Sequence, residues 1–176
     1  MRKSVFVLGL FFVFSFARSQ SVLPLLEPGK VWSIASFMPH GGGATTSYYK
    51  FEGDTLVNGH HYFKTYVCNF DSTLSNWKID TWYGLLREDP AGRVYTPEAD
   101  SEFLIYDFSL LPGDSIFTGF QICSNDCYAY VNYVDSVMVS GTYRKRIVFS
   151  SVLNIRPWIE GIGSLSHVLD PFNRQS

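Results

Sequence analysis

Thr55-Leu-Val-Asn-Gly-His-His-Tyr-Phe-Lys-Thr-Tyr-Val-Cys68 is the stretch that best indicates the fold, because it has the pattern of a β-hairpin. Its central Asn58-Gly59 is the strongest short hairpin signal, since both middle residues of a type I′ turn need a positive φ. The returning strand is predicted over residues 61–68, with side chains that alternate between two faces. Before the hairpin, residues 46–51 are predicted as a strand that a turn at Gly53-Asp54 separates from residues 55–57.

Strands and turns alternate along the rest of the chain. Further strands are predicted over residues 82–88, 93–96, 102–110, 115–122, 128–139, 143–151 and 158–162. The segments between them carry the Gly, Pro, Asn and Asp residues that favour turns, and no window has the 3.6-residue period of a helix. We therefore predict an all-β fold, an antiparallel meander of about nine or ten strands that forms a barrel-like or sandwich domain; both closures stay open.

Residues 1–19 have the pattern of a secretory signal peptide. A cationic start precedes an apolar run over residues 5–16, and Ala17 and Ser19 are the small residues expected before the cleavage point. The run is shorter than the roughly 20 residues that span a bilayer, which argues against a membrane anchor. We predict a mature chain from Gln20 that forms a single β-rich domain over residues 20–176, exported to the periplasm, the cell surface or the medium, without a transmembrane segment.

The charge balance excludes one class of partner. The formal net charge is −2, and removal of Arg2, Lys3 and Arg18 with the leader leaves 11 basic side chains against 16 acidic ones, a net charge of −5. Such a chain lacks the basic surface that nucleic-acid binding requires. Apolar residues make up 46% of the sequence, which is enough for a core and excludes an intrinsically disordered chain.

Three cysteines bear on the compartment and on metal binding. Cys123-Ser-Asn-Asp-Cys127 has turn residues between its thiols, and export places it where disulfides persist, so we predict a local Cys123–Cys127 disulfide. Two thiols without a nearby His are too few for zinc, and we predict no metal and no cofactor. Cys68 could be buried, paired with another chain or paired with a cysteine beyond Ser176; its apolar strand favours burial.

Five strings, in this order, carry a resemblance to a known group of proteins. They are Phe51-Glu-Gly-Asp-Thr-Leu-Val-Asn-Gly59 with Tyr62 and Lys64, Leu86-Arg-Glu-Asp89 with Gly92 and Tyr95, Glu102-Phe-Leu-Ile-Tyr-Asp-Phe108 with Gly113-Asp114, Tyr143-Arg-Lys-Arg-Ile-Val-Phe149 and Trp158-Ile-Glu-Gly-Ile-Gly-Ser164. Over most of residues 28–164 the chain resembles the N-terminal region of uncharacterised secreted Bacteroidetes proteins that often end in a type IX secretion sorting domain. The last string is the most specific. The resemblance implies export and carries no catalytic residue.

The chain departs from that group after residue 164. Leu165-Ser-His-Val-Leu169 stands where relatives continue with a Gly-Leu-Leu-like segment, and no sorting domain follows before Ser176. Two interpretations stay open: a shortened relative, or a fragment of a longer protein that is truncated at its C-terminus.

Trp158 and Glu160 are the candidate ligand-binding residues. On a strand over residues 158–162 they share a face, and the flanking glycines permit close backbone approach. In one interpretation Glu160 lines a pocket with Trp158 as its floor. In the other, which we favour, its carboxylate is bonded to backbone amides or to Arg144 or Arg146 across the sheet.

Other motifs carry weaker chemistry. His40-Gly-Gly-Gly43 matches an oxyanion-hole loop, but the Gly-x-Ser-x-Gly elbow that it needs is missing. His60 and His61 are adjacent and point to opposite faces of a strand, so they are poorly placed to share a metal. Paired acids could hydrolyse a glycosidic bond, although most acids lie beside turns. These acids are Glu88, Asp89, Glu98, Asp100, Glu102, Asp107, Asp114 and Glu160.

Three functions stay open, and the sequence does not favour an enzyme. The leading one is an exported binding or scaffolding domain with an unidentified cell-surface or extracellular partner. The second is a carrier of a small apolar ligand, in which the strands close around a cavity. The third is a carboxylate-based hydrolase. The cavity of a carrier would be lined by some of Tyr48, Phe63, Tyr66, Trp82, Phe103, Tyr106 and Trp158.

We expect the protein purified from its own host to begin at Gln20 and to lack the two thiol hydrogens that one disulfide removes. Intact mass before and after reduction measures both properties. A mass that reduction leaves unchanged would contradict the disulfide, and a mass above that of residues 20–176 would make this chain the first part of a longer protein.

Overall fold

The computed structural model describes residues 22–37, 43–69, 71–81, 84–119, 127–150, 155–169 and 171–172. This part of the chain contains strands and turns. The strands are β1 (Val31–Phe37), β2 (Ala44–Val57), β3 (His60–Asn69), β4 (Lys78–Ile79), β5 (Leu85–Glu88), β6 (Arg93–Glu98), β7 (Ser101–Asp107), β8 (Ser115–Phe117), β9 (Tyr128–Val139), β10 (Thr142–Phe149), β11 (Trp158–Ile159) and β12 (Gly163–Ser164).

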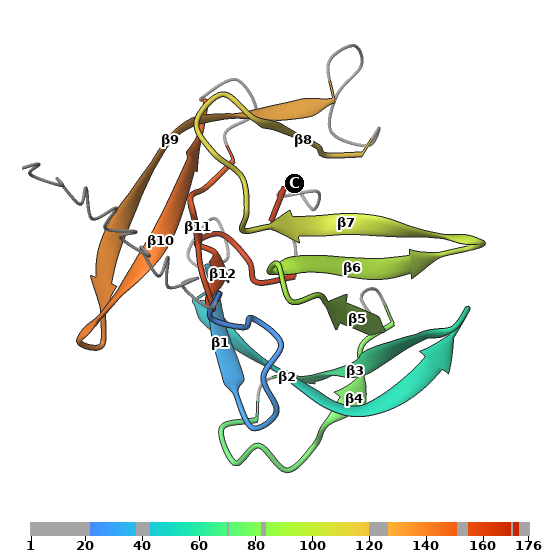
Figure 1. Cartoon of the computed structure of the whole chain (residues 1–176). Coiled ribbons are helices and arrows are strands. Elements are labelled where there is room, and N and C mark those ends of the chain that lie inside the picture. Colours follow the sequence, from blue (N-terminus) through green and yellow to red (C-terminus); the bar gives the residue numbers. More distant parts are fainter. Residues whose placement is uncertain are drawn as a thin grey trace, which may run out of the picture.

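The strands form two antiparallel sheets (Figure 1). The first has the order β1-β2-β3-β5-β6-β7, with β4 also paired to β3, and the second has the order β12-β11-β10-β9-β8. The predicted all-β antiparallel meander is confirmed, in a barrel-like or sandwich arrangement with one strongly curled sheet. The described residues contain twelve strands where about nine or ten were predicted. Strand β1 and the two-residue strands β4 and β12 were not predicted, whereas the predicted segments 46–51 and 55–57 are parts of one strand, β2.

The Asn58-Gly59 hairpin is confirmed, but the turn predicted at Gly53-Asp54 is wrong. Asn58 and Gly59 have φ values of 49° and 81°, as a type I′ turn requires. Strand β2 runs through Gly53 without turning, and its register to β3 shifts between Glu52 and Asp54. Gly53, at φ 65°, therefore belongs to a β-bulge, a second local structure that uses a glycine with positive φ.

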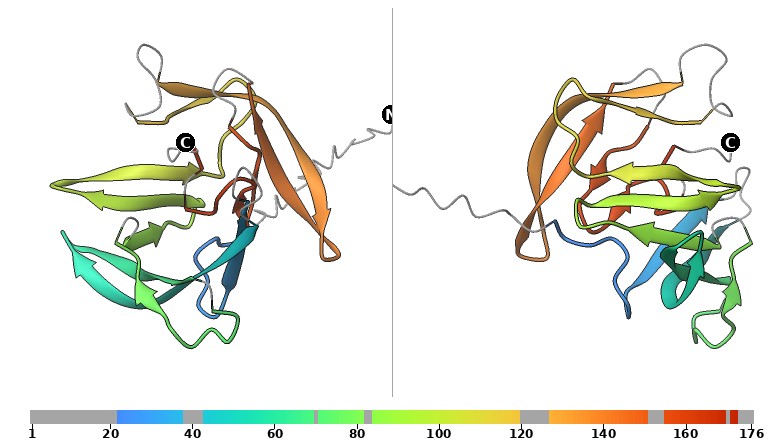
Figure 2. Two further views of the ribbon diagram at one scale, coloured as in Figure 1. Left: turned by 180° about the vertical axis from the view of Figure 1, so that it is seen from behind. Right: turned by 45° about the vertical axis from the view of Figure 1, so that its right-hand side comes forward.

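Strands β9 and β10 form a long hairpin that projects from the rest of the molecule (Figures 1 and 2). Strand β9 has its predicted bounds, and Ser140 and Gly141 form the turn with φ values of 50° and 81°. Val131 pairs with Phe149 and Tyr133 with Val148, so a bulge at Asn132 shifts the register. Beyond the bulge, Val134 and Ser136 lie opposite Ile147 and Lys145, on the face of the hairpin that carries the buried Ile147.

A cluster of aromatic side chains fills the space between the two sheets. Trp158 has 0% of its surface exposed, and its ring lies 4.6 Å from that of Phe149, 4.8 Å from that of Tyr106 and 5.7 Å from that of Phe172. Phe108 stacks on Tyr106 at 5.4 Å. Buried residues of both sheets belong to this one hydrophobic core. Rings at these separations pack in the tilted and edge-to-face geometries that stabilise cores.

Residues 158–164, the C-terminal string, form a tight hairpin and not the predicted strand over residues 158–162. Strands β11 and β12 pair with each other, and the Ile162 amide donates to the Ile159 carbonyl in the turn between them. Trp158 and Glu160 therefore do not share a strand face, which corrects that expectation. Gly163, at φ 97°, lies against β7, where an added Cβ would stand 3.1 Å from the Tyr106 hydroxyl.

Residues 22–30, the N-terminal strap, join the two sheets. The Leu25 and Leu26 amides donate to the Glu88 carboxylate at 3.0 and 2.8 Å, at the end of β5. The Leu23 amide donates to Glu160 in the turn of the C-terminal string at 3.0 Å. The side chains of Leu25 and Leu26 are buried. Two carboxylates from different sheets thus hold the strap in place through backbone amides.

Removal of the Tyr106 hydroxyl is expected to loosen the contact between the sheets. This hydroxyl donates to the Val168 carbonyl at 2.8 Å and accepts from the Ser164 amide at 3.0 Å. Tyr106→Phe leaves two buried backbone groups without these bonds, so we expect a loss of about 1–3 kcal/mol in the free energy of unfolding, measured by urea denaturation. Tyr133→Phe, on the exposed face of β9, is the control. Equal stabilities of the two variants would contradict this role.

Candidate functional site

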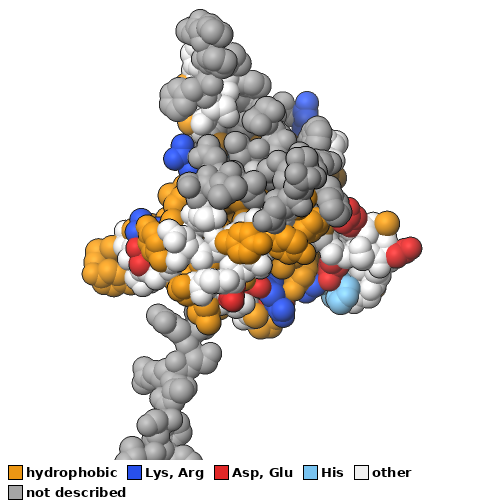
Figure 3. Space-filling model, turned by 90° about the horizontal axis from the view of Figure 1, so that it is seen from above, with side chains coloured by type: hydrophobic (Ala, Val, Ile, Leu, Met, Phe, Trp, Pro, Cys, Tyr) orange, Lys and Arg blue, Asp and Glu red, His pale blue; other side chains and the backbone are white. Residues whose placement is uncertain are grey.

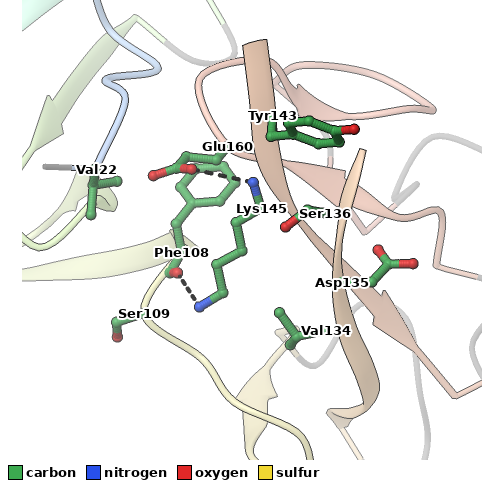
Figure 4. Close-up of a pocket in the computed structure, with 9 residues that line it drawn as sticks. All are labelled: Val22, Phe108, Ser109, Val134, Asp135, Ser136, Tyr143, Lys145 and Glu160. Atoms are coloured by element: carbon green, nitrogen blue, oxygen red, sulfur yellow. Dashed lines mark hydrogen bonds between the residues drawn. The ribbon is translucent and has the colours of Figure 1, made fainter. Parts of the chain in front are cut away.

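A groove of about 400 Å³ lies between the β9–β10 hairpin and the rest of the molecule. The hairpin forms one wall, and the strap, the loop after β7 and the turn of the C-terminal string form the other (Figure 4). Polar and apolar side chains alternate around it. The lining residues are Val22, Phe108, Ser109, Val134, Asp135, Ser136, Tyr143, Lys145 and Glu160.

Lys145 lies along the base of the groove and fastens the crossover loop, residues 108–114, to the hairpin. Its ammonium donates to the carbonyls of Phe108 and Leu110, both at 2.8 Å. Burial lowers the pKa of Lys145, and nearby Glu160 opposes that shift. An ammonium has three N–H donors, so these two bonds leave one for another acceptor.

Glu160 closes the groove at the other end of the Lys145 side chain (Figure 4). Besides the strap amide of Leu23, its carboxylate accepts a bond of 3.3 Å from the Lys145 amide. Arg144 bonds the Glu160 backbone carbonyl and not the carboxylate. Glu160 is therefore bonded to backbone amides and still lines the groove, where two of its carboxylate lone pairs stay available.

Tyr143 and Asp135 lie at the outer part of the groove in different orientations. The Tyr143 side chain is 66% exposed and is paired across the hairpin with Met138, which is also exposed. The Asp135 carboxylate points away from Lys145 and Glu160 (Figure 4). It binds Arg146 through two bonds of 2.8 and 2.5 Å, and this pairing lowers the pKa of Asp135.

The groove matches the sequence-based candidates in part. Glu160 lines it, but Trp158 does not form its floor, because that ring faces the core between the sheets. Lys145 and Tyr143 were not among the candidates. The alternation of β10 held a signal for Lys145, since it shares a face with the core residues Ile147 and Phe149, where a lysine needs polar partners.

Most of the other acidic candidates stabilise turns or pair with arginine. Asp89 accepts from the Ala91 amide at 2.9 Å and pairs with Arg93. Asp107 accepts from the Ser109 amide at 2.8 Å, and Asp114 from the Leu111 amide at the same distance. Glu98 and Asp100 lie exposed at the β6–β7 turn. These bonds are what carboxylates beside turns are expected to make.

Glu102 belongs to a second polar cluster, which joins β3, β5 and β7. Arg87 donates two bonds to its carboxylate, at 2.8 and 2.6 Å, and the Tyr62 hydroxyl donates a third. These bonds lower the pKa of Glu102 to about 2, and the bonds from Arg87 make the largest contribution. Arg87 also lies over the Tyr95 ring, 4.4 Å from its centre. The Glu102 carboxylate thus has three hydrogen-bond partners within the protein, and the cluster holds neighbouring strands together, as cross-strand charge pairs commonly do.

The histidine candidates are not brought together. His60 and His61 are exposed at the start of β3, and His61 Nδ1 lies 2.8 Å from Asp54 beside a shallow hollow near the Gly53 bulge. His167 packs on Tyr49 at 5.3 Å. His40 lies outside the described residues. Within the described ranges, no three His, Cys, Asp or Glu side chains are grouped so that they could hold a metal ion.

The cysteine and carrier candidates have mixed outcomes. Cys68 is buried, as favoured by its strand. Cys127 is buried too, but Cys123 lies outside the described residues, so the Cys123–Cys127 disulfide stays a prediction.

Among the proposed cavity residues, Tyr106 and Trp158 pack in the core, while Tyr48, Phe63, Tyr66 and Phe103 are half-buried. Trp82 is not among the described residues.

Comparison with protein-family models, curated proteins and solved structures finds no match to this chain.

Lysines and arginines are scattered over the face seen in Figure 3, and hydrophobic side chains form separate patches there. The described ranges contain no helix whose length and hydropathy would suffice to cross a membrane.

The Arg87–Glu102 pair is expected to make the fold sensitive to acid. The pKa of Glu102 is about 2 in the folded chain, below its ordinary value of 4.5. The pair therefore contributes stability above about pH 4.5, and this contribution is lost as the pH falls toward 2. Between these values the wild type should lose more stability than Glu102→Gln, measured by urea denaturation. Glu98→Gln, at an exposed turn, should follow the wild type; parallel curves for all three proteins would contradict this assignment.

Proposed function

We propose that this chain is an exported, non-enzymatic β-domain that binds a partner outside the inner membrane through the groove beside the β9–β10 hairpin. The observation that carries the proposal is the composition of that groove. The groove has a volume of about 400 Å³ and is open to solvent, and one of its walls is a sheet face that carries the exposed Tyr143. Concave sites with a few polar groups among apolar ones are the usual places for ligands.

A catalytic role has less support from the same groove. The Glu160 carboxylate is bonded to two backbone amides, and the Asp135 carboxylate points to the opposite face, toward Arg146. A glycosidase needs two carboxyl groups that face each other across the scissile bond. The described groove has one carboxylate facing inward, which favours binding over hydrolysis.

The carrier function also has less support. A carrier barrel keeps its interior free for its ligand, whereas Trp158, Tyr106 and Phe108 fill the space between these sheets. Two of the side chains expected to line a cavity are members of that packing. A ligand that needs a deep apolar interior is therefore a weaker candidate than one that binds at the surface.

Export and the relationship to secreted Bacteroidetes proteins are parts of the proposal. The leader pattern of residues 1–19 and the five strings shared with that group support them. A Cys123–Cys127 disulfide in the mature protein fits an oxidising compartment. In this setting the domain serves as a binding or scaffolding module at the cell surface or in the medium.

Filling the groove is expected to weaken partner binding. Ser136→Trp places a large side chain in the groove, so retention of the fluorescently labelled mature protein on isolated host envelopes should fall about tenfold. Val137→Trp adds the same bulk one residue further along β9, on the other face, and serves as the matched control. Co-sedimentation measures retention, and thermal melting checks that both variants fold. Equal retention of the two folded variants would contradict the groove as the binding site.

A further inference from the structure

We propose that the ligand of the groove is an uncharged saccharide, with one sugar ring stacked on Tyr143 and its hydroxyl groups bonded between Glu160 and Lys145. This inference rests on the proposed function, because it names the class of ligand that the same groove binds. It is carried by three features: the balance of charge, the arrangement of donors and acceptors, and the exposed aromatic ring.

The charges that face the groove balance each other. Lys145 supplies one positive charge and Glu160 one negative charge, and the Asp135 carboxylate is turned to the far face of the hairpin, where it binds Arg146. An anionic ligand would meet Glu160, and a cationic one would meet Lys145. Since like charges at close range oppose binding, the groove favours a ligand without net charge.

Hydrogen-bonding groups are distributed along the groove. Glu160 retains acceptor capacity at one end, and Lys145 retains one N–H donor toward the other. The hydroxyl groups of Ser136 and Tyr143, which also line the groove, can both donate and accept, whereas the Ser109 hydroxyl donates to Asp107 and can only accept. A sugar presents hydroxyl groups that can act in either sense, so it can satisfy charged donors and charged acceptors at once.

The Tyr143 ring provides an apolar platform beside these groups. It stands two residues from Lys145 on the same face of β10, a separation of about 7 Å along a strand. With 66% of its side chain exposed, it is free of the packing that holds the core rings. Aromatic rings at binding sites combine a large contact area with a small loss of conformational freedom. One face of a pyranose ring carries mainly C–H groups and suits such a platform.

Other ligand classes fit less well. A peptide that adds a strand pairs with a sheet edge, whereas the groove is lined by side chains that stand on a face of the β9–β10 hairpin. An amphipathic helix needs a continuous apolar groove, and here Ser109, Ser136 and Lys145 interrupt the apolar residues. The groove volume of about 400 Å³ is in the range of small-molecule sites.

Affinity electrophoresis of the mature protein tests the proposal. The gels contain one of three neutral polysaccharides, namely laminarin, arabinoxylan or yeast mannan, or else anionic dextran sulfate. We expect at least one neutral polysaccharide to retard the wild type. Tyr143→Ala should weaken that retardation about tenfold or more, because ring stacking is lost, while Tyr143→Phe should keep most of it. Tyr133→Ala removes an exposed tyrosine from the opposite face of the same hairpin and should leave the retardation unchanged.

The outcomes separate this inference from the proposed function. Three outcomes would each contradict the assignment of a neutral saccharide as the ligand. They are retardation by none of the neutral polysaccharides, retardation by dextran sulfate alone, and equal retardation of the wild type and Tyr143→Ala. If retention on host envelopes nevertheless fell in Ser136→Trp, the proposed function would stand with a ligand of another class. If neither assay depended on the groove, both proposals would fail.

Discussion

The backbone and side chains of the C-terminal string hold the rest of the structure together. Trp158 packs in the core between the two sheets, and the Glu160 carboxylate bonds both the strap and strand β10. The Ile162 carbonyl accepts from the Trp32 indole at 3.1 Å, and the Ser164 amide donates to the Tyr106 hydroxyl. Seven residues thus contact β1, β7, β10 and the strap. This density of contacts gives a structural reason for the composition of the string.

Charged side chains that bond the backbone also shape the groove. Glu88 and Glu160 bond backbone amides of the strap, and Lys145 bonds carbonyls of the crossover loop. Charged side chains that complete backbone hydrogen bonding have restricted orientations, since movement would leave buried groups without partners. The groove is therefore lined by charges in fixed positions, which is the preorganisation that selective binding requires.

Much of the fold could be predicted from local turn chemistry, whereas the contacts between distant segments could not. Asn58-Gly59 and the long strand β9 follow from residues that are adjacent in sequence. Gly53 was assigned to a turn because a bulge and a turn both use a glycine with positive φ. Glu160 was recognised as a residue with polar partners, but its bond to Leu23 joins residues 137 positions apart, which no local pattern reveals. The sequence did not indicate that Tyr143 lines a groove, because this depends on how far the hairpin projects beyond the core.

The strap has a consequence for the order of folding. Its amides bond Glu88, 62 and 63 positions further along the chain, and Glu160, 137 positions further along. Contacts between such distant residues form late, because the long loop between them must first be closed. The strap can therefore form its bond to Glu160 only after nearly the whole chain has been synthesised. The strap is therefore expected to take its place after the local hairpins of β2–β3 and β9–β10 have formed.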